Sequence, residues 1–301
     1  MSVGDRKDAH HDREGINRID ELIGNTPLVK LNVSDKANVY GKLEKQNPGG
    51  SVKDRIAKAI IDDGIERGVI NKDTTIIEST SGNTGVGLAM IGAAYGLKVV
   101  IYMPKSMSVE RRKLIQAYGA ELRLVDGGVP LANKEAEKAL AETENSFAPS
   151  QFTNEVNVQA HYKTTGPEIW RDTEGDIAAY IAGVGTGGTL TGAGKYLKEQ
   201  DPNVKTYAVE PEESRILEGG ENHPHKIQGI MPGFIPEILD QDGYDGIIHI
   251  STEESFEYQK KLASEQGIFV GISAGAAAAA GAKLAEQPEF AGKNIVVILP
   301  D

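Results

Sequence analysis

The stretch Gly183-Val184-Gly185-Thr186-Gly187-Gly188-Thr189 is the starting point for reading this chain of 301 residues. It follows an apolar run, IAAYIA at 177–182, and precedes LTGAGKYLKE, which reads as a helix. Glycine lets the backbone approach an anion, and the start of a helix supplies unpaired N–H donors and a positive partial charge. The order strand, glycine loop, helix therefore predicts a phosphate site.

The same loop also fits a dinucleotide-binding pattern. Its glycines match G-x-G-x-x-G from Gly183 to Gly188, and Glu210 ends a second apolar run, TYAVE. An acidic residue about twenty positions after such a loop is the expected partner of a ribose hydroxyl. Taken alone, the motif predicts NAD and an oxidoreductase, so the other motifs must decide which ligand the loop holds.

Composition limits the partners. The net charge of −12 argues against binding to nucleic acid or an anionic membrane, because like charges repel over a Debye length of about 10 Å. The chain has no cysteine, which excludes disulfides, zinc-thiolate sites and a cysteine nucleophile. No apolar run approaches the ~18 residues of a membrane span. We expect a cytoplasmic protein with small-molecule partners, and a polar tail at 1–15 without a function.

Apolar runs separated by helical stretches indicate the fold class. Several of them are nearly continuous, which is typical of strands covered by helices on both faces. The chain is therefore predicted to be α/β with mainly parallel sheets, and the polar segment 146–157 is a candidate domain border. The expected strands are 74–78, 98–103, 121–126, 177–182, 205–210, 246–250, 267–272 and 294–299.

A second strand-to-helix turn is rich in hydrogen-bonding groups. Thr80-Ser81-Gly82-Asn83-Thr84 follows the run at 74–78 and precedes a glycine- and alanine-rich helix. Hydroxyl groups, an amide and open N–H groups at one helix start suit a carboxylate or a second anion. The same residue types are also ordinary helix caps, so this turn alone leaves both interpretations open.

A third turn, NPGGSVKDR, places Lys53 in the first turn of a helix that Ser51 and Asp54 are expected to cap as a box-like pair. A cation there opposes the helix dipole at a cost of about 0.3–1 kcal/mol. Most lysines are simply solvated. A buried amine beside a positive partial charge would instead have a lowered pKa and could attack a carbonyl carbon to form a Schiff base.

The fourth turn, Gly271-Ile272-Ser273-Ala274-Gly275, matches the G-x-S-x-G elbow of a serine hydrolase. A hydrolase of that fold needs its acid and then its histidine after the serine. All six histidines of this chain precede Ser273, so the order of the residues excludes that reading. Ser273 is left as a neutral hydrogen-bonding group at the end of an expected strand.

Together the four turns fit pyridoxal 5′-phosphate and an amino-acid substrate. Lys53 would hold the aldehyde, the glycine loop the phosphate, the turn at 80–84 the substrate carboxylate, and Ser273 the ring nitrogen. A neutral hydroxyl at that nitrogen keeps the ring a weaker electron sink, which favours elimination of a β-leaving group. The NAD hypothesis leaves Lys53 and the turn at 80–84 without a role.

Seven ordered motifs make the chain resemble a known family. It is similar over about residues 16 to 301 to the cysteine synthase (O-acetylserine sulfhydrylase) family, with cystathionine β-synthase as a near relative. The motifs are NPGGSVKDR, TSGNTG, SQFTN, KTTGPEIW, GVGTGGTLTG, HKIQGI and GISAGAA. The resemblance implies the tryptophan synthase β-like fold (fold type II), a homodimer and a possible complex with serine acetyltransferase.

The resemblance also implies a domain division and residue roles. The N-terminal α/β domain would be 47–157, and the C-terminal, phosphate-binding α/β domain 16–46 with 158–301, with the cofactor between them. Lys53 would bind the cofactor and remove the substrate α-proton. The other cofactor-binding residues would be Asn83 at the phenolic oxygen, Gly185, Thr186, Gly187, Gly188 and Thr189 at the phosphate, and Ser273 at the ring nitrogen; the substrate-binding residues would be Thr80, Ser81, Gly82, Thr84, Gln151 and Gly229, with no metal.

The reaction implied is that of a transferase: sulfide replaces the acetate of O-acetyl-L-serine through an aminoacrylate intermediate and gives L-cysteine. One departure leaves the substrates open. Where relatives read GIGAGF, this chain has Met231 and Pro232 in GIMPGF, near the expected mouth of the site. O-phosphoserine or serine as first substrate, and thiosulfate or homocysteine as nucleophile, stay alternatives, as does a cystathionine β-synthase-type reaction. We expect neither the haem module nor the regulatory domain of the animal enzyme of that type.

Overall fold

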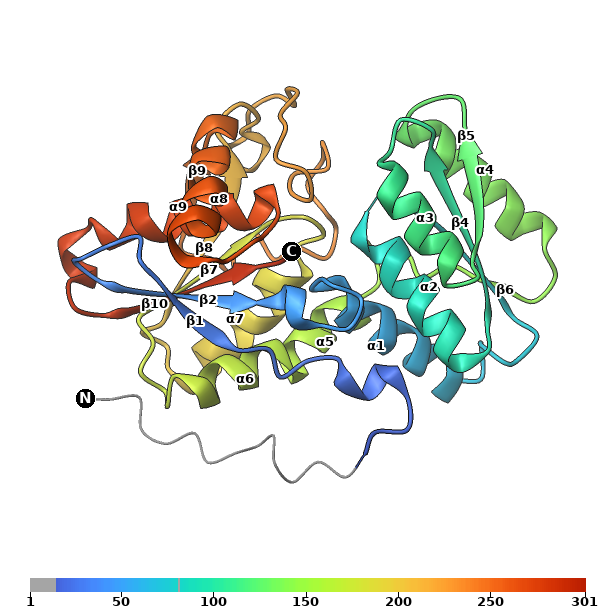
Figure 1. Cartoon of the computed structure of the whole chain (residues 1–301), viewed down its shortest axis with the longest axis horizontal. Coiled ribbons are helices and arrows are strands. Elements are labelled where there is room, and N and C mark those ends of the chain that lie inside the picture. Colours follow the sequence, from blue (N-terminus) through green and yellow to red (C-terminus); the bar gives the residue numbers. More distant parts are fainter. Residues whose placement is uncertain (1–14, 81) are drawn as a thin grey trace.

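The computed structural model describes residues 15–80 and 82–301 and contains two mainly parallel sheets (Figure 1), which confirms the predicted α/β class. The six-stranded sheet has the order β1-β2-β10-β7-β8-β9, and the four-stranded sheet has the order β5-β4-β3-β6. Figure 1 shows the four-stranded sheet on the right and the six-stranded sheet on the left, with helices α1 and α5 between them.

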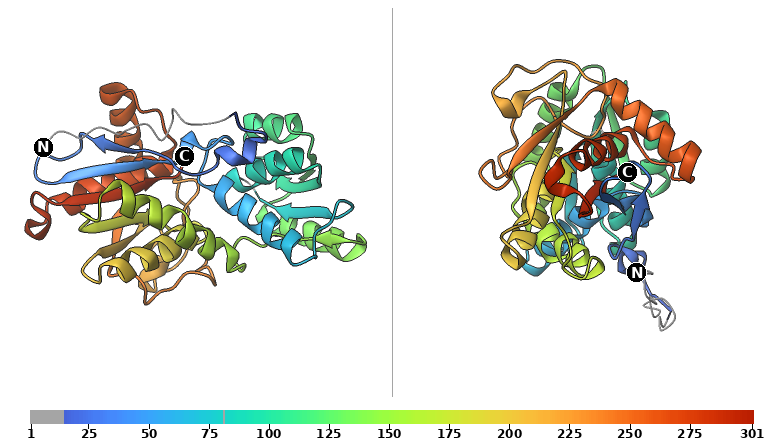
Figure 2. Two further views of the ribbon diagram at one scale, coloured as in Figure 1. Left: turned by 90° about the horizontal axis from the view of Figure 1, so that it is seen from below. Right: turned by 90° about the vertical axis from the view of Figure 1, so that its left-hand side faces the viewer.

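The six-stranded sheet is parallel except for β1, which pairs antiparallel with β2. Figure 2 shows its twist from two further directions. Its strands are β1 (Leu28–Leu31), β2 (Asn38–Leu43), β7 (Ala179–Gly183), β8 (Lys205–Pro211), β9 (Gly246–Ile250) and β10 (Asn294–Leu299). The helices that accompany it are α5 (Val156–Lys163), α6 (Thr165–Asp172), α7 (Gly188–Gln200), α8 (Thr252–Gln266) and α9 (Ile272–Ala285).

The four-stranded sheet is parallel throughout. It consists of β3 (Thr75–Ser79), β4 (Lys98–Pro104), β5 (Glu121–Val125) and β6 (Ser146–Phe147). Its helices are α1 (Lys53–Glu66), α2 (Asn83–Tyr95), α3 (Val109–Ala117) and α4 (Val129–Glu142). Short 3-10 helices lie at Ile19–Leu22, Glu44–Gln46, Ile216–Glu218 and Pro288–Phe290.

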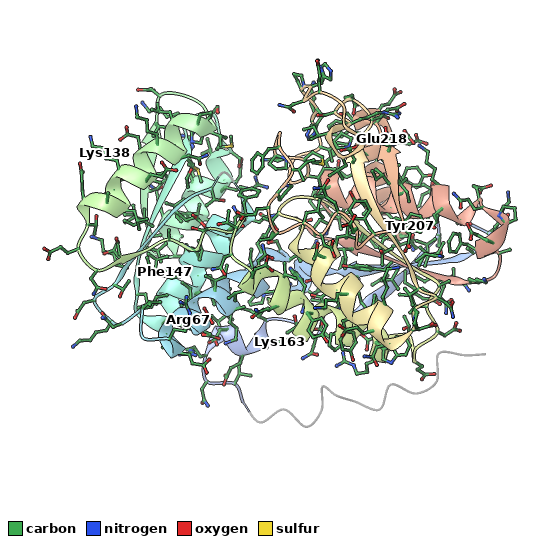
Figure 3. All side chains as sticks on the ribbon, turned by 180° about the vertical axis from the view of Figure 1, so that it is seen from behind. Arg67, Lys138, Phe147, Lys163, Tyr207 and Glu218 are labelled. Carbon is green, nitrogen blue, oxygen red and sulfur yellow. The ribbon has the colours of Figure 1, made fainter. Side chains whose placement is uncertain are left out.

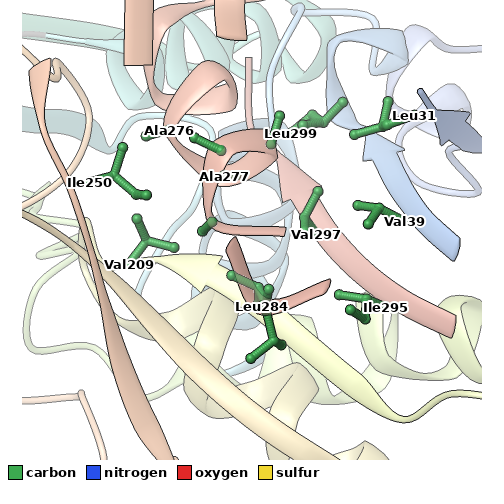
Figure 4. Packing of buried hydrophobic residues seen from close by; sticks show 14 of the residues in the cluster. Leu31, Val39, Val209, Ile250, Ala276, Ala277, Leu284, Ile295, Val297 and Leu299 are labelled. Carbon is green, nitrogen blue, oxygen red and sulfur yellow. The ribbon is translucent and has the colours of Figure 1, made fainter. Parts of the chain in front are cut away.

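Both faces of each sheet are buried, as the continuous apolar runs predicted. In β10, Val297 packs toward α9 while its neighbour Val296 packs on the opposite face with residues of α7. Figure 4 shows the first of these cores, where Ala276 and Ala277 of α9 lie against Val297 and Leu299. The alanines let α9 approach the sheet closely, so a single helix can cover several strands.

Seven of the eight expected strands are present within one or two residues, and the run at 267–272 is the exception. This segment lies between α8 and α9, and the side chain of Gln259 donates to the Val270 carbonyl at 3.0 Å. Gly267 ends α8 in the left-handed conformation, at φ +69°. The segment is therefore a short helix-to-helix connection, so Ser273 follows a loop and not a strand. Strands β1, β2 and β6 were not expected from the sequence.

The start of α1 differs from the predicted capping box. The Ser51 hydroxyl accepts from the Lys53 N–H at 3.1 Å, and Asp54 turns back to accept from the Gly49 N–H at 2.6 Å. Ser51 therefore bonds to the first residue of α1 and Asp54 to the NPGG turn, instead of the two bonding reciprocally. The result is a tight entry into α1 that fixes the backbone at Lys53.

We propose that the domains follow the two sheets, with 47–157 as one domain and 16–46 with 158–301 as the other. Figure 3 shows the molecule from behind, with Phe147 on the side of the four-stranded sheet and Tyr207 on the side of the six-stranded one. Across residues 15–80 and 82–301, we find no helix whose length and apolar character would let it cross a membrane.

Candidate functional site

Lys53 begins α1 at the end of the six-stranded sheet. The N–H of Val52 donates to the carbonyl of Pro300, just after β10, at 2.9 Å. The Lys53 side chain is half-buried, and burial lowers the pKa of its amine from 10.5 to about 8. No charged or hydrogen-bonding partner among the described residues contributes to this shift. A useful fraction of the amine is therefore neutral, and so nucleophilic, near neutral pH.

The turn at the start of α2 lies beside the start of α1. A Cβ atom on Gly87 of α2 would lie 3.3 Å from the Lys53 carbonyl oxygen, so the two helices are packed backbone to backbone. The Gly82 N–H donates to the Thr80 hydroxyl at 3.3 Å, and Asn83 is the first residue of α2. Ser81, which the sequence also assigned to this turn, lies outside the described residues.

Gln151 joins this turn from a distant part of the chain, as the sequence assignment requires. The Thr84 hydroxyl donates to Gln151 Oε1 at 2.6 Å, and both residues are buried. Glu78, at the end of β3, accepts from the backbone N–H of Gln151 at 3.4 Å and also from that of Ser150. Burial raises the pKa of the Glu78 carboxyl to about 7. The sequence analysis did not single out Glu78.

The glycine loop connects β7 to α7, as predicted. Gly187 has φ +89°, which favours glycine, and it precedes the first residue of α7. The Thr186 hydroxyl is buried and accepts from the Gly188 N–H at 3.3 Å. The loop therefore leaves backbone N–H groups at the start of a helix, which is the arrangement expected for a phosphate.

Two residues of α5 contact this loop, and neither was predicted from the sequence. Asn157 donates to the Thr186 hydroxyl at 2.9 Å, and Nε2 of His161, one turn further on, lies 3.3 Å from the Thr189 hydroxyl. Burial lowers the pKa of His161 to about 3, so its ring is neutral. Both are buried, but they lie in the polar segment SQFTNEVNVQAH, which does not mark them as residues on the buried face of a helix.

Gly229 brings the glycine loop and Ser273 together. A Cβ atom on Gly185 would lie 2.7 Å from the Gly229 carbonyl oxygen, and a Cβ atom on Gly229 would lie 3.6 Å from Ser273 Oγ. Gly229 has φ +103°, a conformation that other residues rarely adopt. Ser273 is buried in the first turn of α9. Gly185 and Ser273, assigned to the cofactor, and Gly229, assigned to the substrate, are therefore neighbours in space.

Met231 packs into the core behind the glycine loop. It is 4% exposed, lies in one cluster with Val184, and its N–H donates to the Val184 carbonyl at 2.8 Å. Its φ of +47° is unusual for a residue with a side chain, and a ring nitrogen of His225 lies 3.2 Å from its carbonyl oxygen. The Met231 side chain therefore packs against the glycine loop from the core, whereas the neighbouring Pro232 is exposed.

Glu210, which supported the NAD hypothesis, is fully buried and already bonded. Its carboxylate accepts from the Leu217 N–H at 2.6 Å and lies 3.0 Å from His249 Nε2. A carboxylate that binds a ribose must face a ligand, and this one instead holds the segment after β8 in place. The structure gives the dinucleotide pattern no acidic partner at Glu210.

The geometry fits pyridoxal phosphate. The site contains a half-buried amine with a lowered pKa, a glycine loop at a helix start, and a serine hydroxyl beside that loop. At Gly185 and Gly188 a Cβ atom would come within 2.7 and 2.0 Å of neighbouring atoms, so the loop backbone approaches its surroundings more closely than any other residue would allow.

Comparisons with known proteins agree with this geometry. Residues 19–301 match the family described as "Pyridoxal-phosphate dependent enzyme". A cysteine synthase of Staphylococcus aureus strain Mu50 is 50% identical over 291 residues, covering 95% of this chain and 93% of its own. The solved structure of a cysteine synthase from Entamoeba histolytica is 43% identical with a TM-score of 0.94, covering 98% of this chain and 89% of its own. A hydrogen sulfide-producing enzyme from Fusobacterium nucleatum is 44% identical with a TM-score of 0.92, covering 96% and 97%.

Proposed function

The chain belongs to the family of pyridoxal-phosphate dependent enzymes, and from this premise we propose that it is a cysteine synthase, which replaces the acetate of O-acetyl-L-serine with sulfide. The observation that carries the proposal is the Lys53 amine, whose pKa burial lowers to about 8, beside the turn at the start of α2. The similarity to cysteine synthases over nearly the whole chain supports the choice of substrates.

Bound pyridoxal phosphate supplies stabilisation of negative charge at the α-carbon of the amino acid attached to it. Lys53 would hold the cofactor through its neutral amine, and the same Nζ would be the base that receives the substrate α-proton. Thr84 and Gln151, together with Thr80, Ser81 and Gly82, would orient the substrate carboxylate at the start of α2, whereas Asn83 would hydrogen-bond the phenolic oxygen of the cofactor. Ser273 would offer a neutral hydroxyl to the ring nitrogen and would therefore add no negative charge there.

Turnover with defined substrates tests this function. Purified protein supplied with cofactor should form L-cysteine and acetate in equal amounts from O-acetyl-L-serine and sulfide. We expect kcat/KM with sulfide to exceed that with homocysteine by at least roughly tenfold, since a site shaped for a small nucleophile discriminates by about 1–3 kcal/mol. Similar values for the two nucleophiles would favour a cystathionine β-synthase-type reaction and overturn the assignment.

The lowered pKa of Lys53 predicts how cofactor attachment depends on pH. Only the neutral amine attacks the aldehyde, so below pH 8 the rate should rise about tenfold per pH unit and should level off above a pKa of about 8. Stopped-flow absorbance after mixing the apoprotein with cofactor measures this rate. A rate that kept rising to pH 10, as for an ordinary lysine, would contradict the lowered pKa.

We also propose a homodimer in the cytoplasm, with serine acetyltransferase as a possible partner. The homodimer and the partner rest on the family resemblance, and the location rests on the composition of the chain. Size-exclusion chromatography with light scattering tests the dimer, and a pull-down with the C-terminal peptide of the acetyltransferase tests the complex.

A further inference from the structure

Asn157 lies between the two loops of the proposed site. It is 1% exposed, and its amide nitrogen donates to two acceptors: the Gln151 carbonyl oxygen at 3.0 Å and the Thr186 hydroxyl at 2.9 Å. A backbone carbonyl oxygen can only accept, so the amide nitrogen must be the atom that faces Gln151. The orientation of the Asn157 side chain is fixed by this contact.

The two bonds reach different parts of the site. On one side, Gln151 accepts from the Thr84 hydroxyl at the start of α2, where the four-stranded sheet ends. On the other side, Thr186 belongs to the glycine loop that follows β7 of the six-stranded sheet. A single buried amide therefore bridges the turn assigned to the substrate carboxylate and the loop assigned to the phosphate.

The contact with Asn157 also sets the direction of the Thr186 hydroxyl. That oxygen accepts from Asn157 Nδ2 and from the Gly188 N–H at 3.3 Å, which occupies both of its lone pairs. Its hydrogen atom is then left to donate to a third group. In a loop that binds an anion, such a hydroxyl is a preoriented donor.

The oxygen atom of the Asn157 amide, in contrast to its nitrogen atom, makes no hydrogen bond within the described part of the chain that would explain its orientation. Among the described residues, Oδ1 of Asn157 is buried without a hydrogen-bond partner, and a Cβ atom on Gly188 would lie 2.0 Å from it. Leaving a buried carbonyl unpaired costs about 1–3 kcal/mol. Rotating the amide by 180° would place Oδ1 against the Gln151 carbonyl oxygen. Two acceptor oxygens would then face each other, and the hydrogen bond from Nδ2 would be lost.

We propose that Asn157 is a positioning residue that couples substrate binding to cofactor binding, by holding Gln151 and by directing the Thr186 hydroxyl at the cofactor phosphate. This inference rests on the proposed function and adds to it a residue that touches neither ligand. It makes a specific prediction about which substitution is the more damaging.

Asn157→Ala and Asn157→Asp separate this role from simple packing. Aspartate keeps the shape of asparagine, but its carboxylate would accept from Thr186, reverse the hydroxyl and add negative charge beside the phosphate site. We expect the dissociation constant of pyridoxal phosphate from the apoprotein to rise about tenfold in Asn157→Ala and about 100-fold in Asn157→Asp. A packing role predicts the opposite order, because the isosteric variant would then be the milder one.

The coupling itself has a separate readout. In Asn157→Ala, KM for O-acetyl-L-serine should rise several-fold together with the cofactor dissociation constant. The double variant Asn157→Ala/Thr186→Ala should bind cofactor no more weakly than Thr186→Ala alone. The reason is that the two substitutions remove the same interaction with the cofactor, the one made by the Thr186 hydroxyl. Additive losses would mean that Asn157 acts through something other than Thr186.

The controls keep this test distinct from that of the proposed function. Gln159→Ala changes an exposed residue of the same helix and should behave as wild type. If wild-type protein binds no pyridoxal phosphate, the proposed function fails; if wild type is normal and Asn157→Asp binds cofactor as tightly as Asn157→Ala or more tightly, the role of Asn157 fails. Should thermal melts show that Asn157→Asp is unfolded, Asn157→Leu keeps bulk without donors, and wild-type cofactor affinity in it would overturn the proposal.

Discussion

A Lys53→Ala variant is expected to lose turnover by about 10³-fold or more and to lose the visible absorption of the lysine-bound cofactor. The physical reason is that the site offers this amine in a partly neutral form, since burial lowers its pKa to about 8. Absorbance spectra with added pyridoxal phosphate, together with steady-state cysteine formation, measure both effects.

Lys58→Ala is the matched control for this prediction. Lys58 lies on the same helix but is partly exposed and paired with Asp20 and Asp62, at 2.7 and 3.1 Å. We expect it to keep the absorption band and most of the activity. A Lys53→Ala protein that still attaches cofactor covalently and turns over near the wild-type rate would show that another amine does the chemistry.

The sequence predicted the structure best where a single residue type determines the local structure. Continuous apolar runs predicted strands covered on both faces, and the glycine loop lies between β7 and α7 as its pattern required. The apolar run at 267–272 was misread because composition alone does not distinguish a strand from a short connection between two helices. Strands β1 and β2 were missed because their sequences, LVKL and NVYGKL, mix apolar with polar residues instead of forming a continuous apolar run, and β2 contains Gly41, where a Cβ atom would lie 2.5 Å from Leu299.

The separate turns of the candidate site were predicted from the sequence, but the contacts that join these turns could not be predicted. The bridge from Gln151 through Asn157 to Thr186 depends on the helix α5 lying between two sheets. The sequence shows Asn157 only as one polar residue in a polar segment. Met231 was singled out by its motif, but its surroundings were predicted wrongly. The motif placed it near the mouth of the site, and its side chain lies in the core.

A buried ionic network anchors α1, and therefore Lys53, to the six-stranded sheet. Arg55, two residues after Lys53, donates through Nε to Glu44 and through Nη1 and Nη2 to Glu168 at 2.7 and 2.8 Å. Lys42 of β2 donates to Glu168 at 3.0 Å, and all four side chains are buried. Burial would raise the pKa of Glu168, but Arg55 and Lys42 outweigh it and hold the pKa at about 2. Arg55 also lowers the pKa of Glu44 against the effect of burial, so both carboxylates stay charged and depend on their partners.

An Arg55→Met variant should be destabilised by about 3–5 kcal/mol, because it leaves two buried carboxylates with Lys42 as the remaining cation of this network. The midpoint of thermal unfolding should fall by roughly 10 °C.

Arg67→Met is the matched control near the end of the same helix. The ion pair of Arg67 with Asp63, at 2.8 Å, is largely exposed, so its loss should cost less than about 1 kcal/mol. Calorimetry on the apoproteins separates the two variants. Equal midpoints for Arg55→Met and wild type would show that the network does not stabilise the fold, and Lys53 would then need another anchor.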